Sequence, residues 1–372
     1  MDALICRSCR RTYALDDPRW RCECGGVLDL QFTPRLDWAA LGQRKPNLWR
    51  YREALPVQKD RSIVSFEEGF TPLLALPIDG RQVWIKQDHL FPSGSYKDRG
   101  AAVMISKARE LGIPAVVEDS SGNAGCAVAA YCARAGIECT IYVPEDTAAA
   151  KLAQIQWYGA NLIRVPGSRE DTARAVLQAA QTTYYASHSW NPFFFQGTKT
   201  FAYEVCEQLE WQAPDALVLP AGNGTLLLGA AIGFAELRAQ GVIENPPRLI
   251  AVQSQACAPL ALAFRDHLGS NPAIRKEDTL AEGIAIADPI RGPQIVDAVR
   301  QSGGTFLTVS EAEIREALRE ISRLGIYIEP TAAATVAGLR QYLRSAGPTE
   351  RIVSVFTGSG LKTTEKMLKL LA

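Results

Sequence analysis

One lysine stands in a run of residues whose composition suits covalent chemistry. Lys97 ends the run Pro92-Ser93-Gly94-Ser95-Tyr96-Lys97 and precedes a predicted helix that starts near Arg99. A lysine in this place lies at the positive end of the helix dipole, and a neutral lysine amine is a nucleophile that can form a Schiff base with an aldehyde. Most lysines are simply solvated. The interpretation of Lys97 as a catalytic residue therefore depends on the other loops of the chain.

Three further loops, each after a predicted strand, could bind a phosphorylated aromatic cofactor. Asn123, in loop 120–125, has an amide that both donates and accepts hydrogen bonds. Loop 221–225 could bind phosphate through backbone N–H groups at a helix start, without a basic residue. Thr357, in loop 357–360, could hydrogen-bond a ring nitrogen. Each loop alone could be an ordinary turn or helix cap, but together with Lys97 they supply every contact that pyridoxal 5'-phosphate (PLP) needs.

The loops are positioned by predicted strands that alternate with predicted helices from about residue 62 onward. The predicted strands are 83–86, 115–118, 139–143, 162–165, 216–219, 249–252 and 352–356. The predicted helices are 99–111, 124–134, 148–158, 169–181, 200–209, a long one from about 226, 312–323 and 332–344. This alternation predicts βαβ units and a mainly parallel sheet, in which ligands bind beyond the carboxyl ends of the strands.

These motifs resemble those of the fold type II PLP enzymes, the tryptophan synthase β-like superfamily, over roughly residues 60–365. The resemblance is carried by Glu68-Gly69-Phe70-Thr71-Pro72-Leu73, by the run 93–100, and by Thr357-Gly358-Ser359-Gly360-Leu361-Lys362. Dehydratases and cysteine synthases of the superfamily vary the residues after the lysine. The Lys97-Asp98-Arg99-Gly100 run is most similar to that of the threonine synthases.

The resemblance implies an α/β fold with mainly parallel sheets and two domains. Residues 31–105 and 191–372 would form a large PLP-binding domain, and residues 106–190 a smaller mobile domain. Lys97 would be the catalytic residue that carries PLP, Asn123 would bind the phenolic oxygen of the cofactor, and Thr357 would face its pyridine nitrogen. The cofactor phosphate would be cradled by Gly222, Asn223, Gly224, Thr225 and Leu226. The substrate would contact Ser95, Ser121, Ala124, Asn191 and Lys199.

Some residues depart from the threonine synthase pattern, and they bear on the substrate. Ala124 stands where Thr or Ser is usual, Phe194 stands at about the place of an arginine that binds the substrate phosphate, and Ser359 replaces a histidine. Residues 281–285 resemble a segment of serine/threonine dehydratases. The expected reaction is that of threonine synthase, from O-phosphohomoserine and water to threonine and phosphate. The alternative is a serine/threonine dehydratase or a related β-elimination or β-replacement enzyme, and the third possibility is a non-catalytic α/β ligand-binding protein.

Four cysteines crowd into the first 24 residues and could bind a metal. Cys6 and Cys9 are separated by two residues, Cys22 and Cys24 by one, and the two pairs by 12 residues. Two such pairs can close a tetrahedral zinc site. We therefore predict a small zinc-ribbon-like module over residues 1–30 with a structural zinc ion, and free thiols are the alternative. A catalytic metal is not expected, because no histidine lies nearby in the sequence.

The composition limits the classes of molecule that the protein is expected to bind. Lys plus Arg and Asp plus Glu both number 40 in the 372 residues, and a zero net charge gives no general attraction to nucleic acid or anionic membranes. The apolar stretch 216–235 is interrupted by Pro220 and Gly222, so it predicts a strand, a loop and a buried helix rather than a membrane span. No secretory signal and no disulfide-scaffold pattern are visible, so we expect a cytoplasmic protein. By the resemblance to PLP enzymes, we expect a homodimer that acts on a small amino acid. His89, His188 and His267 are interpreted as structural.

Overall fold

The computed structural model describes residues 2–371, which fold into two compact units. Unit 1 contains the chain up to Phe70 and Lys97–Thr198, and unit 2 contains Thr71–Tyr96 and the chain from Lys199 onward. The unit borders are not those of the predicted domains: residues 31–70 and 97–105 lie in unit 1, where the helix that begins at Lys97 packs on other helices. The predicted mobility of residues 106–190 stays a prediction.

Within its described residues, unit 1 contains two sheets. The first is antiparallel, has the order β2-β1-β3, and comprises β1 (Ala3–Cys6), β2 (Thr12–Ala14) and β3 (Leu28–Gln31). The second is parallel, has the order β8-β7-β6-β9, and comprises β6 (Ala115–Glu118), β7 (Glu138–Pro144), β8 (Asn161–Val165) and β9 (Tyr184–Tyr185).

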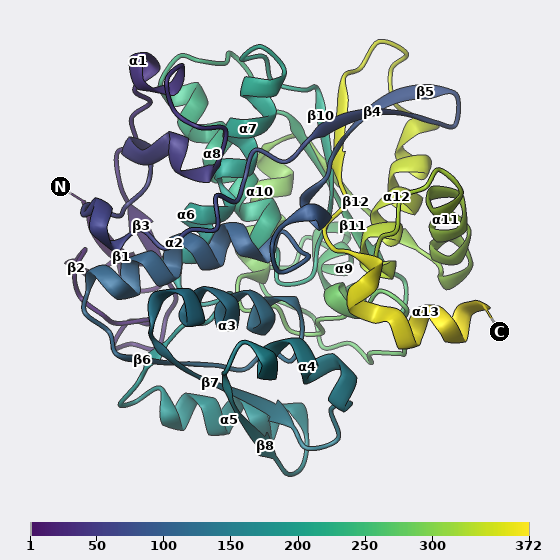
Figure 1. Cartoon of the computed structure of the whole chain (residues 1–372). Coiled ribbons are helices and arrows are strands. Elements are labelled where there is room, and N and C mark those ends of the chain that lie inside the picture. The colour runs from purple at the N-terminus through teal and green to yellow at the C-terminus, as the bar shows by residue number, and fades with distance from the viewer. Residues whose placement is uncertain (1, 372) are drawn as a thin grey trace. The chain divides into compact units, whose positions relative to one another are not determined.

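The helices of unit 1 surround the parallel sheet and one another. They are α1 (Trp38–Leu41), α2 (Lys97–Glu110), α3 (Asn123–Ala135), α4 (Ala149–Trp157), α5 (Arg169–Ala179) and α6 (Pro192–Thr198), with 3-10 turns η1 (Leu48–Ala54) and η2 (Asp60–Ser62). In Figure 1, α3 and α4 lie on one side of β6, β7 and β8, and α5 lies on the other.

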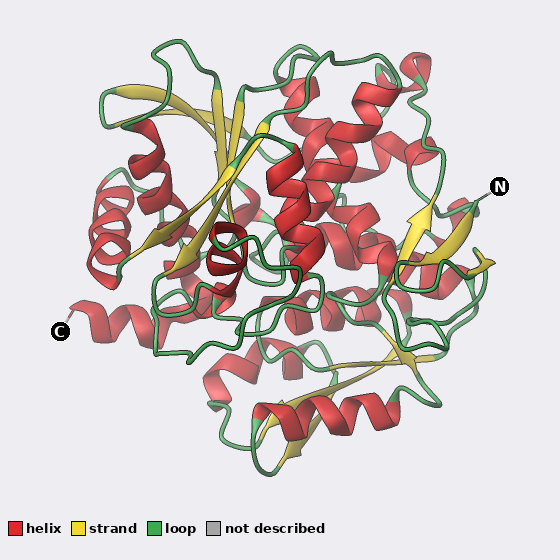
Figure 2. Ribbon diagram, turned by 180° about the vertical axis from the view of Figure 1, so that it is seen from behind, coloured by secondary structure: helices red, strands yellow, loops and turns green. Residues whose placement is uncertain are grey.

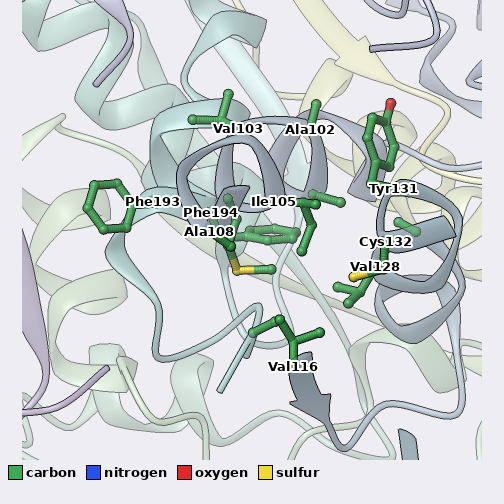
Figure 3. Close-up of a cluster of buried hydrophobic side chains, with 14 of the residues drawn as sticks. Ala102, Val103, Ile105, Ala108, Val116, Val128, Tyr131, Cys132, Phe193 and Phe194 are labelled. Atoms are coloured by element: carbon green, nitrogen blue, oxygen red, sulfur yellow. The ribbon is translucent and has the colours of Figure 1, made fainter. Parts of the chain in front are cut away.

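Helix α2 is the centre of the unit 1 core. Most of its residues are buried, because α3 packs along one side of it and α6 along another. Figure 3 shows Phe194 of α6 lying against α2, and Phe194 is completely buried. The packing is so close that a Cβ atom at Gly100 would overlap the Phe194 ring, and one at Gly197 would overlap the carbonyl oxygen of Arg99.

Unit 2 is built on one larger sheet with the order β12-β11-β10-β13-β5-β4. Its strands are β4 (Leu73–Ile78), β5 (Arg81–Lys86), β10 (Ala216–Pro220), β11 (Arg248–Ser254), β12 (Thr305–Val309) and β13 (Ile352–Val355). Neighbouring strands are parallel except for the edge strand β4, which is antiparallel to β5. Strand β10 lies inside the sheet and is buried along its whole length, which explains its uniformly apolar sequence.

Helices cover both faces of this sheet. They are α7 (Thr200–Gln208), α8 (Thr225–Ala239), α9 (Pro259–Arg265), α10 (Gly292–Gln301), α11 (Glu311–Arg323), α12 (Pro330–Leu343) and α13 (Thr364–Leu371), with 3-10 turns η3 (Asp88–Leu90), η4 (Glu282–Ile284) and η5 (Gly360–Thr363). Helices α11 and α12 lie on one face and α8 and α10 on the other, and Figure 2 shows the twist of the strands between them.

The predicted α/β fold with mainly parallel sheets is confirmed, and every predicted strand and helix from β5 onward is present with small shifts of its ends. The sequence did not predict β9, α6, α9, α10, β12 or α13, of which β9 has only two residues and α10 and β12 follow a long irregular stretch. Among the described residues, no helix combines the length and the apolar character that crossing a membrane requires.

The contact between α2 and α6 generates a stability prediction. Gly197→Ala should lower the free energy of unfolding by about 1–3 kcal/mol, because the added methyl group meets backbone rather than a flexible side chain. Gly269→Ala is the control, since a Cβ atom there meets nothing within 4 Å, and it should change stability by less than about 0.5 kcal/mol. Thermal unfolding followed by circular dichroism measures both, and equal stabilities would contradict the packing argument.

Candidate active site

Two of the predicted loops lie at the same edge of the unit 2 sheet. Loop 221–225 follows β10, and Thr357 follows β13 after one intervening residue. The two strands are parallel neighbours, with Ala216 paired to Ile352. Their carboxyl ends therefore carry both loops, which is where open α/β sheets bind ligands.

Loop 221–225 presents the start of a long helix. Gly224, with φ +65°, is the N-cap of α8, and within residues 2–371 no side chain caps this helix end and no acidic residue lies in its first turn. The Ala221 N–H donates to the carbonyl of Val252 (2.9 Å), and Gln253 donates its Nε2–H to the Ala221 carbonyl (2.9 Å). The loop is thus held on β11, with the positive end of the helix dipole available to an anion.

The segment before Lys97 is tied to both loops. The hydroxyls of Tyr96 and Thr225 share a hydrogen bond of 2.8 Å, and the Tyr96 N–H donates to the Thr357 carbonyl (3.0 Å). Lys362 Nζ donates to the Ser93 carbonyl (2.8 Å). Tyr96 was not among the predicted site residues, although an aromatic hydroxyl directly before the lysine was the available signal.

Two hydroxyl groups at this edge are buried but have no partner. Ser95 Oγ and Thr357 Oγ1 make no hydrogen bond with any described residue, although both residues are at most 1% exposed. Leaving such a group unsatisfied costs about 1–3 kcal/mol, and most buried polar groups in proteins are paired. Unpaired hydroxyls beside a helix start that suits an anion fit a ligand with a phosphate and a polar ring, such as PLP.

In unit 1, Lys97 and Asn123 begin the two packed helices. Lys97 is the first residue of α2, which starts slightly earlier than the predicted position near Arg99, and Asn123 is the first residue of α3. Both side chains are half-buried. The Nζ atom of Lys97 lies 5.8 Å from the centroid of the Phe194 ring.

The residues predicted to bind substrate have different surroundings. Ser121 is half-buried in the loop before α3, and Ala124 is buried in the first turn of that helix. Asn191 donates to the Tyr184 hydroxyl (2.7 Å) and accepts from the Phe193 N–H (3.1 Å).

Lys199 has an ion-pair partner. Its side chain is fully buried, and its ammonium forms an ion pair with Glu236 (2.9 Å) in unit 2. Burial lowers the pKa of Lys199, and Glu236 opposes that effect. With this partner on α8, the Lys199 ammonium already has a structural function.

The histidines divide into paired and unpaired cases. His188 Nδ1 lies 2.8 Å from the Glu118 carboxylate, in agreement with a structural interpretation. His89 packs edge-on against Phe356, with 5.8 Å between ring centroids, and burial lowers its pKa. Its Nδ1 atom is buried without a partner in the part of the chain that the structure describes.

The dehydratase-like segment 281–285 contains η4 and supports loop 221–225. A Cβ atom at Gly222 would lie 2.8 Å from the Cα atom of Ile284, so the two backbones are in close contact. The Gly283 N–H donates to Thr331 Oγ1 (3.2 Å), and the Glu282 carboxylate pairs with Lys366 of α13 (2.6 Å). Glu282 is half exposed, so this ion pair is a surface feature.

The four predicted metal ligands come together in the N-terminal part of unit 1. The sulfur atoms of Cys6, Cys9, Cys22 and Cys24 all lie within 4.8 Å of one another.

Comparisons with known proteins show to which family this chain belongs. A family model described as pyridoxal-phosphate dependent enzyme matches residues 64–358. The threonine synthase of Methanocaldococcus jannaschii is 36% identical over 379 residues, covering 98% of this chain and 94% of that protein. The threonine synthase of Synechocystis sp. is also 36% identical, covering 84% of this chain and 82% of that protein.

The chain belongs to the threonine synthase family of PLP-dependent enzymes. The predicted resemblance is therefore confirmed.

Solved structures agree with this family's fold. A threonine deaminase from Solanum lycopersicum matches with a TM-score of 0.70 and 23% identity, covering 81% of this chain and 83% of that one. A PLP-dependent aspartate racemase matches with a TM-score of 0.68 and 25% identity, covering 78% and 90%. The fold type II architecture is thus shared with enzymes that differ in their named reactions.

The unpaired Thr357 hydroxyl generates a prediction about the cofactor-free protein. Thr357→Val should leave its thermal stability unchanged or higher, because a buried hydroxyl without a partner is removed. The same variant should bind PLP roughly tenfold more weakly if the hydroxyl bonds the cofactor. Stability is measured by calorimetry and affinity by fluorescence titration.

The matched control is Thr335→Val in α12, where the hydroxyl donates to the Thr331 carbonyl (3.3 Å). This control should lose about 1 kcal/mol of stability and keep its PLP affinity. A Thr357→Val protein that is destabilised and binds PLP normally would assign this hydroxyl to the protein structure alone.

Proposed function

We propose that this protein converts O-phosphohomoserine and water into threonine and phosphate. The observation that carries the proposal is the Lys97-Asp98-Arg99-Gly100 run in a chain that matches a threonine synthase over 98% of its length. In this reaction phosphate leaves from Cγ of the substrate and water adds at Cβ, so the atoms balance without an oxidant or a reductant.

The proposed cofactor contacts follow from the groups described above. Bound PLP supplies an electron sink for negative charge that develops on the substrate carbons. Lys97 Nζ would hold the cofactor covalently, and Asn123 would bind its phenolic oxygen. The backbone N–H groups of residues 222–226 would bind its phosphate, as the uncapped start of α8 favours.

Two residues would control protons and charge during the reaction. The Lys97 amine would take a proton from the substrate and return it, because a neutral amine is both base and nucleophile. Thr357 Oγ1 would face the ring nitrogen as a neutral partner. A hydroxyl there stabilises a protonated ring less than a carboxylate would, which favours elimination and replacement chemistry.

Anionic groups of the substrate would bind at the start of α3. This helix has Gly122 as its N-cap, and among the described residues no side chain caps it. Its N–H groups, together with the hydroxyl of the half-buried Ser121, suit a carboxylate or a phosphate. Ala124, which is buried in the first turn of α3, would form part of the apolar wall there. In unit 2, the buried Ser95 hydroxyl lacks a partner within residues 2–371 and is a further donor that we propose for the substrate.

A second candidate function is a lyase acting on an unphosphorylated hydroxy amino acid. The observation that favours it is Phe194, which stands at about the position of the expected phosphate-binding arginine and lies beside Lys97. Losing a charge-assisted hydrogen bond costs about 1.5–3 kcal/mol, or roughly 10–100-fold in affinity. Donors at the start of α3 could replace much of this loss, so threonine synthase stays the first proposal.

We also propose the location, the oligomeric state and the partners of the enzyme. A cytoplasmic homodimer acting on a small amino acid is the arrangement that we expect, and the zero net charge supports the absence of nucleic-acid partners. Sedimentation at several concentrations measures the oligomeric state.

Lys97→Ala should abolish turnover and the absorbance band of the lysine-bound cofactor, because no other residue in the run carries an amine side chain. Lys45→Ala is the control, since Lys45 is 75% exposed and pairs only on the surface with Glu67. Absorbance spectra and unfolding curves of both variants provide the measurement. If Lys97→Ala keeps the band, another lysine holds the cofactor.

Substrate competition decides between the two proposed functions. The purified enzyme with PLP should release phosphate and form threonine from O-phosphohomoserine, with little ammonia from threonine or serine. Phosphate release, amino-acid analysis and 2-oxo acid detection are measured side by side. Production of 2-oxo acid and ammonia from threonine or serine, without reaction of O-phosphohomoserine, would establish the second candidate instead.

A further inference from the structure

The four N-terminal cysteines have the geometry of a metal site. The sulfur atoms of Cys6 and Cys24 lie 3.5 Å apart, and so do those of Cys9 and Cys22. Tetrahedral zinc with Zn–S bonds of about 2.3 Å requires sulfur atoms about 3.8 Å apart. The observed spacing is too long for disulfide bonds, which require about 2.05 Å, and it suits four thiolates around one ion.

The turns that carry these cysteines are shaped around the sulfur atoms. The Cys9 N–H points at the Cys6 sulfur (3.5 Å), and the Arg7 N–H donates to the Val27 carbonyl (3.1 Å), which joins the two cysteine turns. A Cβ atom at Gly26 would lie 2.9 Å from the Cys6 sulfur. A glycine is therefore required where the second turn passes the first cysteine.

The segment between the two cysteine pairs enters the core of unit 1. Trp20 is 7% exposed and donates its Nε1–H to the Ala180 carbonyl (3.2 Å) at the end of α5. Its ring makes edge-to-face contacts with Tyr185 (5.0 Å) and Trp190 (5.2 Å). The cysteine module is thus anchored in the packing of unit 1 by one large side chain.

Tyr185, which contacts Trp20, is hydrogen-bonded to the loop that leads to Asn123. Tyr185, in β9, donates its hydroxyl to the Asp119 carboxylate (2.9 Å). Asp119 directly follows β6 and begins the loop that leads to Asn123 at the start of α3. A displacement of Trp20 would therefore remove the support behind Tyr185 and, through it, behind this loop.

We propose that Cys6, Cys9, Cys22 and Cys24 bind one zinc ion, and that the ion fixes Trp20 as a support for the loop 119–122. The Cys9 and Cys22 ligands flank the Trp20 segment in sequence, so closing the site restricts that segment. Four protein ligands leave no open position, which assigns the zinc to structure rather than catalysis. The metal site is independent of which amino acid the enzyme converts.

Metal content tests the first part of the proposal. The full chain, purified with PLP and without chelators, should contain about one zinc per chain by mass spectrometry. Cys9→Ala should lose the metal, whereas Cys139→Ala, which removes a buried thiol outside the cluster, should keep it. Cobalt in place of zinc should give the intense visible bands of tetrahedral thiolate coordination, a test that needs no variant.

Three results would overturn the zinc assignment. They are wild-type protein without metal, bound iron in place of zinc, and disulfide bonds among the four cysteines in protein prepared under reducing conditions.

Hydrogen exchange tests the second part. In Cys9→Ala, peptides that contain residues 115–122 and 184–190 should exchange roughly tenfold faster, whereas β10 and β11 of unit 2 should not change. Trp20→Ala should keep its zinc and show the same faster exchange. Trp38→Ala is the control because Trp38 is 52% exposed. Unchanged exchange in residues 115–122 of a zinc-free or Trp20→Ala protein would contradict the support.

Discussion

The hydrogen bonds of Tyr96 are the restraint on which the proposed chemistry depends. Its hydroxyl is held by Thr225 at the start of α8, and its N–H by the carbonyl of Thr357. Lys97 is the next residue, and consecutive Cα atoms are about 3.8 Å apart. One aromatic residue thus connects loop 221–225 and the Thr357 loop, and it directly precedes the proposed catalytic lysine in the chain.

A chain without net basic charge binds anions at local sites, and this one offers helix starts for that purpose. Helices α3 and α8 both begin without a side-chain cap among the described residues, and both follow strands of largely parallel sheets. The unpaired hydroxyls of Ser95 and Thr357 carry a cost that a bound ligand would remove. Cofactor binding and folding stability would therefore be coupled, since a ligand that binds only the folded protein stabilises it.

Local patterns predicted the parts of the fold that have local causes. Strand β10 and helix α8 follow from an apolar run broken by glycines, and the lysine motif was recognisable from adjacent residues. The surroundings of Lys199 could not be predicted in this way, because its partner Glu236 lies 37 residues further along the chain and becomes a neighbour only through helix packing. The Trp20 contact with Ala180 joins residues 160 positions apart, so a module that looks separate in the sequence is part of the unit 1 core.

Phe194 shows why family membership and substrate choice are different questions. Its ring is fully buried and rests on Gly100 of α2, where any added Cβ atom would overlap it. An arginine at this position would place a charge in that contact, and an unpaired buried charge is strongly unfavourable. The packing of α6 on α2 and an arginine at residue 194 therefore exclude each other in this arrangement. A threonine synthase with this core has to bind the substrate phosphate through other donors. The start of α3, which no side chain caps among the described residues, is the group of donors that unit 1 offers for it.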